Sequence, residues 1–242
     1  MWRSGMLKRY GDIIMGLLML VMIILLAGHG VDVVKEAGAA AESEEAQEEI
    51  PKARVVVIDS GHGGNDPGKV GINEALEKDI NLNIALKVKD LLTENGVTVI
   101  MTRETDAGLY RESDSNKKIA DLKQRCKIIE DSGAAVTVSI HQNSYHLGSV
   151  SGPQVFYYKN SEEGKKLAEF LQESLAAASN QKSRGVKSND NYYLLLNVST
   201  PVVIAECGFL SNWEDAQKLV TEEFQQKLAE ALCEGILAYL DS

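Results

Sequence analysis

The chain has 242 residues, and 44% of them are hydrophobic, which is enough for one well-filled globular domain with an additional segment. Its formal net charge is -10 with only 6% aromatic residues and no basic stripe, so the composition argues against a nucleic-acid-binding protein. Three cysteines are too few, and odd in number, for a disulfide framework, and we expect all three to be small buried hydrophobic residues.

We expect the N-terminal region to carry a targeting signal. Arg3, Lys8 and Arg9 precede an uncharged apolar run over residues 13–28. This run is slightly short of the roughly 20 residues that span a bilayer, yet long for the core of a signal peptide. We therefore expect residues 1–34 to form an uncleaved signal anchor that contacts the membrane, with a cleaved signal peptide as the alternative. The positive flank predicts that the rest of the chain is exported.

Residues 35–53 are rich in glutamate and alanine and contain almost nothing large and apolar. Such a segment cannot bury enough surface to offset the entropy lost on ordering, so we expect an acidic flexible linker. The folded domain is expected to cover residues 54–242.

The first half of this domain alternates strand and helix patterns. Residues 55–58 are four apolar β-formers, and they lead through Asp59 to His62, which is surrounded by glycines. A helical apolar stripe over residues 73–95 places Glu77 in its first turn. A second strand over 97–103, a long surface loop and a helix over about 118–131 follow.

The second half continues the alternation. We expect strands over 134–144, 152–159 and 200–209, a helix over 162–179, and a closing helix over about 214–240. Residues 191–197 fit a short strand or an ordered loop. The pattern predicts an α/β fold with an open, mostly parallel twisted sheet and helices on both faces.

Ligands of open α/β sheets bind beyond the carboxyl ends of the strands, and His62, His141 and Glu206 all lie at or just beyond such ends. Two neutral imidazoles and a carboxylate are ligands that leave a fourth zinc position open for water, and Glu77 is the best candidate for the carboxylate. Zinc would lower the pKa of that water, and Glu206 would take its proton and return it to the leaving nitrogen. The expected reaction is metal-assisted amide hydrolysis.

Simpler interpretations remain open at this point. A histidine at a strand end is often only a hydrogen-bonded loop residue. Burial of Glu206 in an apolar strand would be costly without a partner, which favours a metal or a cation beside it. Cys207 points to the opposite face from Glu206 and is a poor ligand candidate. Residues 63–69 match a phosphate-binding loop pattern, but Val70 follows and no helix is expected to start there.

Five motifs in this order carry a family resemblance: IDSGHGGNDPG, EKDINL, VIMTRETD, SIHQNS and IAECGFLSN. They resemble the zinc-dependent N-acetylmuramoyl-L-alanine amidases of the type 3 class over essentially residues 54–240. Within that family the chain is most similar to sporulation amidases that act on spore cortex. The resemblance has three bases: the single anchor, the absence of cell-wall-binding repeats, and the run KKIADLKQRCKII.

The resemblance implies one zinc ion per chain with His62, Glu77 and His141 as ligands, and Glu206 as the catalytic glutamate. Glu74 is a nearby competitor outside the EKD motif. The substrate implied is peptidoglycan, cut between N-acetylmuramic acid and L-alanine of the stem peptide. In spore formers this cut leads towards muramic-δ-lactam, the mark that germination enzymes recognise.

The chain departs from the family pattern at Ser60, where proline is usual, and at Gln142, where a small residue is common. The segment after His141 is too short for an inhibitory helix, which favours control by a separate partner protein or by expression timing. Two other functions stay open: a catalytically idle peptidoglycan-binding module and a zinc peptidase. Arg125, Asn143 and Arg184 are possible substrate contacts for which a structural role is equally compatible.

Overall fold

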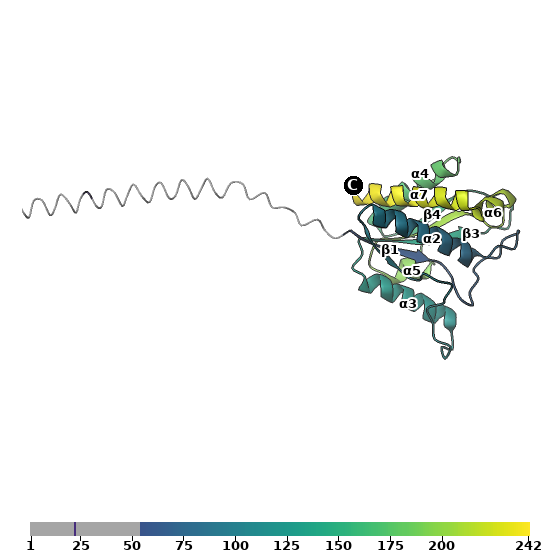
Figure 1. Ribbon diagram of the computed structural model, residues 1–242, viewed down its shortest axis with the longest axis horizontal. Helices are drawn as coiled ribbons and strands as arrows, with labels where there is room; N and C mark the ends of the chain where they lie inside the picture. The colour runs from purple at the N-terminus through teal and green to yellow at the C-terminus, as the bar shows by residue number, and fades with distance from the viewer. Residues whose placement is uncertain (1–21, 23–53) are drawn as a thin grey trace, which may run out of the picture. The chain divides into compact units, whose positions relative to one another are not determined.

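The computed structural model describes Met22 and residues 54–242 (Figure 1). The expected anchor over 1–34, Met22 apart, and the expected linker over 35–53 lie outside the described residues. Among the residues that are described, no helix is both long and apolar enough to cross a membrane.

A six-stranded sheet in the order β2-β1-β3-β6-β4-β5 forms the centre of the domain. Its strands are β1 (Val55–Ser60), β2 (Thr98–Met101), β3 (Val136–Asn143), β4 (Gln154–Tyr158), β5 (Lys187–Asn189) and β6 (Val202–Phe209). Strands β2, β1, β3 and β6 are parallel, whereas β4 runs antiparallel to β6 and β5 pairs parallel with β4. The predicted mostly parallel sheet is confirmed.

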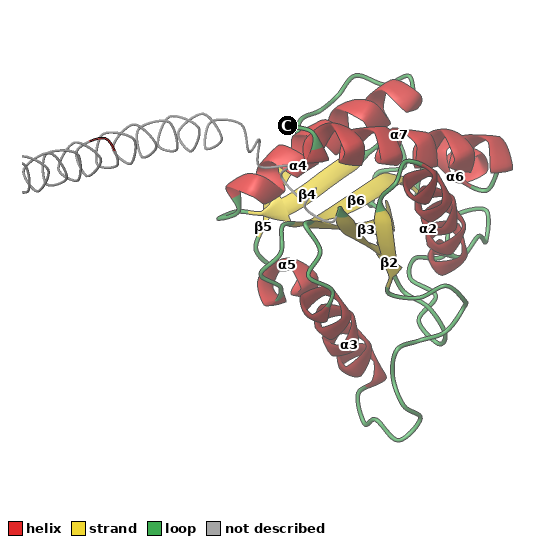
Figure 2. Cartoon of the chain, turned by 60° about the vertical axis from the view of Figure 1, so that its left-hand side comes forward, coloured by secondary structure: helices red, strands yellow, loops and turns green. Residues whose placement is uncertain are grey.

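Helices cover both faces of this sheet, as predicted (Figure 2). One face packs against α2 (Glu77–Glu94), α4 (Glu162–Ala178) and α7 (Glu222–Leu240) in the larger core. The other face packs against α3 (Lys117–Asp131) and α5 (Tyr193–Asn197) in a smaller core. Successive side chains of β1 alternate between these two cores: Val56 and Ile58 enter the larger one and Val57 the smaller one.

Two predicted elements differ from the structure. Residues 191–197 were expected as a strand or loop, but Tyr193–Asn197 form the short helix α5 because adjacent Leu194 and Leu195 both bury against the smaller core. The closing helix is split into α6 (Trp213–Leu219) and α7. The break occurs where the Thr221 side chain accepts a hydrogen bond from the Phe224 backbone and begins a new helix. Strand β5 was not predicted, since its three residues carry no apolar alternation.

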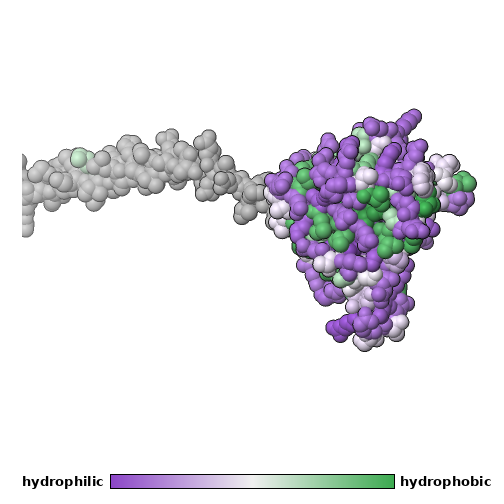
Figure 3. All heavy atoms as spheres, turned by 45° about the vertical axis from the view of Figure 1, so that its right-hand side comes forward, coloured by the Kyte–Doolittle hydropathy of each residue, from purple (hydrophilic) through white to green (hydrophobic). Residues whose placement is uncertain are grey.

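The surface of the domain is mainly polar. Figure 3 shows hydrophilic side chains over most of one face, with apolar side chains in smaller groups between them. All three cysteines are free and buried, as expected from the sequence.

Candidate metal centre

The carboxyl ends of β1, β3 and β6 meet at one edge of the sheet, and the predicted site residues lie there. His141 of β3 and Glu206 of β6 are direct neighbours in register, so their side chains emerge from the same face. The β3–β6 register shifts between His141 and Asn143, an irregularity of the kind often found beside active sites. The loop after β1 carries His62 to the same place.

The His62 backbone is held in an unusual conformation. Its φ is 61°, in the left-handed region that non-glycine residues seldom adopt, and Gly63 and Gly64 that follow also have positive φ values. The Nδ1 atom of His62 lies 3.0 Å from Oδ2 of Asp66, while Nε2 lies 3.2 Å from Oε2 of Glu77. Burial alone would lower the pKa of His62, but hydrogen bonds and the charges of Glu77 and Asp66 raise it.

Glu77 is the first residue of α2. No side chain caps this helix, and the preceding loop accepts the hydrogen bonds of its first backbone N–H groups instead. The backbone N–H groups of Glu77 and Lys78 donate to the carbonyls of Lys69 and Pro67. The Glu77 carboxylate is buried and accepts hydrogen bonds from the backbone of Lys69 and Gln142, at 2.7 and 3.1 Å. Burial opposes its ionisation, but hydrogen bonds to the two histidines outweigh burial and hold its pKa well below the usual range.

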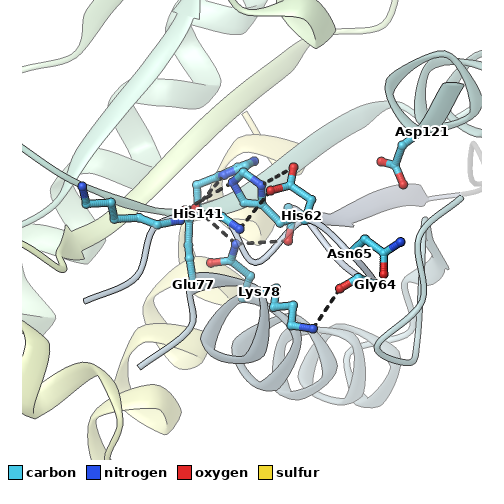
Figure 4. Close-up of polar contacts among 12 residues, drawn as sticks. His62, Gly64, Asn65, Glu77, Lys78, Asp121 and His141 are labelled. Carbon is cyan, nitrogen blue, oxygen red and sulfur yellow. Dashed lines mark hydrogen bonds and ion pairs between the residues drawn. The ribbon is translucent and has the colours of Figure 1, made fainter. Parts of the chain in front are cut away.

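His141 approaches the same carboxylate from the sheet. Its Nδ1 lies 2.9 Å from Oε1 of Glu77, and its ring is 4.9 Å from the His62 ring between centroids. Figure 4 shows both imidazoles directed towards Glu77. A Cβ atom at Gly61 would lie 2.3 Å from the His141 ring, so only glycine at position 61 leaves room for this imidazole.

One nitrogen from each histidine and one oxygen from Glu77 all lie within 4.8 Å of one another. The donor set of two imidazoles and one carboxylate is that of three-ligand catalytic zinc sites. His62 and Glu77 each also have a second contact that holds their orientation, such as the Asp66 carboxylate beside His62 Nδ1. The residues present therefore fit a zinc ion, and Glu74, the sequence competitor, is exposed and outside the cluster.

Glu206 is 7% exposed and lines a cavity of about 470 Å³ together with His62, Glu77 and His141. Its Oε2 atom is buried without a hydrogen-bond partner in the described structure. Burial raises the pKa of Glu206 to about 7, so the carboxyl group can exchange a proton near neutral pH. Tyr192 lines the same cavity, and its own pKa is raised to about 12 by burial and by the nearby charge of Glu206.

The four candidates from the sequence, His62, Glu77, His141 and Glu206, therefore meet in one cavity. Cys207 lies in the larger core on the other face of the sheet, as expected. Arg125 is 2% exposed and pairs with Asp59 at 2.6 Å while donating to the carbonyl of His62, so its role is structural.

Other residues of the site were not identified from the sequence. Asp66 and Asn81 contact the ligands and lie inside or next to the quoted motifs, but nothing in their spacing distinguishes them. The Gln142 side chain, at one of the two departures from the family pattern, is buried and donates to Asn81. Tyr192 belongs to the segment whose fold was mispredicted.

A family model described as N-acetylmuramoyl-L-alanine amidase matches residues 56–238. The germination-specific N-acetylmuramoyl-L-alanine amidase of Bacillus subtilis is 40% identical over 189 residues, which cover 77% of this chain and 79% of the relative.

Solved structures show the same similarity. The CwlD amidase of Clostridioides difficile, solved in complex with the GerS lipoprotein, has a TM-score of 0.75 and 40% identity over 78% of this chain and 98% of that chain. The catalytic domain of the amidase CwlV from Bacillus (Paenibacillus) polymyxa has a TM-score of 0.69 and 35% identity over 78% and 98% of the two chains.

Proposed function

The chain belongs to the N-acetylmuramoyl-L-alanine amidase family, and we propose that it is a zinc-dependent enzyme acting on peptidoglycan. The bond cleaved is the amide between N-acetylmuramic acid and L-alanine of the stem peptide. The observation that carries this proposal is the convergence of His62, Glu77 and His141 beside the buried Glu206.

His62, Glu77 and His141 would hold one Zn²⁺ ion. When bound, zinc supplies Lewis-acid polarisation of the scissile carbonyl and lowers the pKa of a water molecule. Asp66 keeps the His62 ring oriented through Nδ1, and the backbone of Lys69 and Gln142 keeps both Glu77 oxygens in place. The ligands are thus fixed before substrate arrives, which lowers the reorganisation that catalysis would otherwise require.

Glu206 is the residue that moves the proton. Its carboxylate would accept a proton from the attacking water, and its carboxylic acid would return that proton to the leaving nitrogen. Glu206 lies one strand away from His141, on the wall of the same cavity as the three proposed metal ligands, which supports this role.

The site of action that we propose is spore cortex, on the route to muramic-δ-lactam. The germination-specific relative from Bacillus subtilis supports this proposal, because it is 40% identical. The chain would act outside the cytoplasm, exported and either membrane-anchored through residues 1–34 or secreted. We also propose that a partner protein binds the chain and activates it; binding of a partner is supported by the related amidase that was solved in complex with a lipoprotein.

Product identification tests the proposed reaction. Purified chain is loaded with zinc and incubated with peptidoglycan, and the products are analysed by mass spectrometry. We expect intact stem peptides that begin with a free L-alanine amine. Peptides cut internally would instead identify a zinc peptidase, and a folded, zinc-loaded protein that releases nothing, with or without sporulating-cell extract, would identify a binding module.

A further inference from the structure

The short segment after β2, residues 102–106, contacts both chain segments that carry proposed metal ligands. It belongs to the VIMTRETD motif, yet none of its residues lies in the metal cluster or lines the cavity that contains Glu206. The proposed ligands His62 and Glu77 come from two different segments, the loop after β1 and the start of α2. Their separation therefore depends on whatever holds those two segments together.

The Arg103 side chain connects the loop after β1 with the start of α2 by donating hydrogen bonds to their backbone carbonyls. It is 4% exposed, and its Nε donates to the carbonyl of Ser60 at 3.0 Å. Its Nη2 donates both to the carbonyl of Gly61 at 3.0 Å and to the carbonyl of Lys78 at 2.8 Å. Gly61 immediately precedes His62 and Lys78 immediately follows Glu77, so one guanidinium links the residues adjacent to two ligands.

Asp106 makes a second connection on the other side of His62. Its Oδ1 accepts a hydrogen bond from the Gly64 backbone at 2.9 Å, and its Oδ2 pairs with Lys78 Nζ at 2.6 Å. Lys78 Nζ also donates to the Gly64 carbonyl at 3.0 Å, a contact drawn in Figure 4. The loop after β1 is therefore held by hydrogen bonds both before and after His62.

These contacts on both sides of His62 explain how its backbone keeps the left-handed conformation. A non-glycine residue keeps such a φ only where its surroundings fix the backbone on both sides. We propose that Arg103, Lys78 and Asp106 form a clamp that sets the separation of His62 and Glu77 and thereby the affinity and geometry of the metal site. This inference rests on the zinc site of the proposed function, and its residues are positioning residues.

Substitutions in the clamp test this role against a matched control. Arg103→Lys keeps the charge but cannot bridge the two segments with a planar fork, and Lys78→Met removes both contacts of the ammonium. Lys89→Met is the control, because Lys89 is on the same helix and pairs with Glu104 of the same segment at 2.6 Å without touching the His62 loop. The readouts are the zinc dissociation constant, the absorption spectrum of the Co²⁺-substituted protein, and metal-free unfolding in urea.

We expect both clamp variants to weaken zinc binding by about 10- to 100-fold and to change the Co²⁺ spectrum, as losses of contacts behind metal ligands do. Lys89→Met should bind zinc like the parent. Parental zinc affinity and an unchanged Co²⁺ spectrum in folded clamp variants, even with lower stability, would overturn the inference. If Arg103→Lys does not fold, Lys78→Met decides, and failure of the parent to bind zinc would instead refute the proposed function.

Discussion

Glu206 shows how the environment of one residue prepares it for chemistry at the expense of stability. A carboxyl group ionises in water, but burial raises the pKa of Glu206 from 4.5 to about 7. The folded protein therefore retains a proton that the unfolded chain releases between these two values. Stability contributed by this group must fall as the pH rises from about 4.5 to about 7, and then level off.

Glu206→Gln removes this titration while keeping the shape of the side chain. In the absence of metal we expect the variant to be more stable than the parent at pH 8 by about 3–3.5 kcal/mol, since the pKa is raised from 4.5 to about 7 and one pKa unit corresponds to about 1.4 kcal/mol. At pH 4 the two proteins should have similar free energies of unfolding. Urea unfolding at both pH values measures this, and an equal difference at pH 4 and pH 8 would show that the carboxyl group is not destabilised by burial.

Asp66 illustrates a residue that would act on a bound metal ion through its neighbour His62. Because its carboxylate lies 3.0 Å from His62 Nδ1, it fixes the orientation of the imidazole and leaves Nε2 facing Glu77. We expect Asp66→Asn to raise the zinc dissociation constant by about 10- to 100-fold. Asp190→Asn, which alters a carboxylate paired only with Lys159 on the surface, is the control. Equal zinc affinity in the two variants would remove Asp66 from the metal site.

At the scale of elements, the packing of β1 against α3 depends on a buried ion pair. Asp59 and Arg125 are 1% and 2% exposed, and Thr102 and Ser139 also donate to the Asp59 carboxylate. Burial alone would raise the pKa of Asp59, but Arg125 and these hydrogen bonds lower it from 3.8 to about 2. The pair is thus satisfied in the sense that buried charges require.

This shift gives the domain a specific acid sensitivity. Stability from Asp59 is fully present above pH 3.8 and is lost as the pH falls through about 2, a total of about 2 kcal/mol. Asp59→Asn should lower stability at pH 7 by roughly 3–5 kcal/mol, because Arg125 loses a buried partner.

Unfolding experiments at several pH values test the lowered pKa of Asp59. Between pH 5 and pH 2 the parent should lose about 2 kcal/mol more than Asp59→Asn in urea unfolding experiments. Parallel stability curves for the two proteins would contradict the depressed pKa of Asp59.

The elements that could be predicted from the sequence are those with strong local patterns. The apolar strands of the parallel sheet and the amphipathic helices α2, α3 and α4 were expected close to their observed bounds, because hydrophobic periodicity dominates them. Strand β5 and helix α5 were missed because three and five residues are too short to show a period. The Thr221 cap that separates α6 from α7 was present in the sequence but was outweighed by the continuous apolar pattern.

The site residues that could be predicted from the sequence are those carried by the predicted strands. His62 follows β1, and His141 and Glu206 lie in the carboxyl-terminal halves of β3 and β6, so fold class alone brings them towards one edge of the sheet. Asp66 and Asn81 contact His62 and Glu77 from only four positions away, but nothing in their spacing distinguishes them from other polar residues. Arg103 was not identified because its role depends on contacts between residues distant in the sequence. Its side chain reaches a carbonyl 42 positions away.

At the scale of the whole molecule, family membership and cavity agree on a peptidoglycan amidase, while the spore cortex is the proposed place of action. The anchor expected over residues 1–34 stays a prediction, since it lies outside the described residues apart from Met22.

If the chain acts on spore cortex as proposed, spores made without it should lack muramic-δ-lactam. Muropeptide analysis of cortex measures this, with a strain expressing Glu206→Gln as the control for loss of catalysis alone. Normal muramic-δ-lactam in both strains would exclude the cortex role.

The most direct test of the central claim compares the parent and Glu206→Gln at equal zinc content on purified peptidoglycan. Zinc content is measured first, because His62, Glu77 and His141 are unchanged in the variant and both proteins should bind one ion. The rate at which stem peptides with a free L-alanine amine appear is then followed by mass spectrometry. We predict that the variant is slower by about 10²- to 10⁴-fold, the usual contribution of a general acid–base group. Equal rates at equal zinc content would contradict the assignment of Glu206 as the residue that moves the proton.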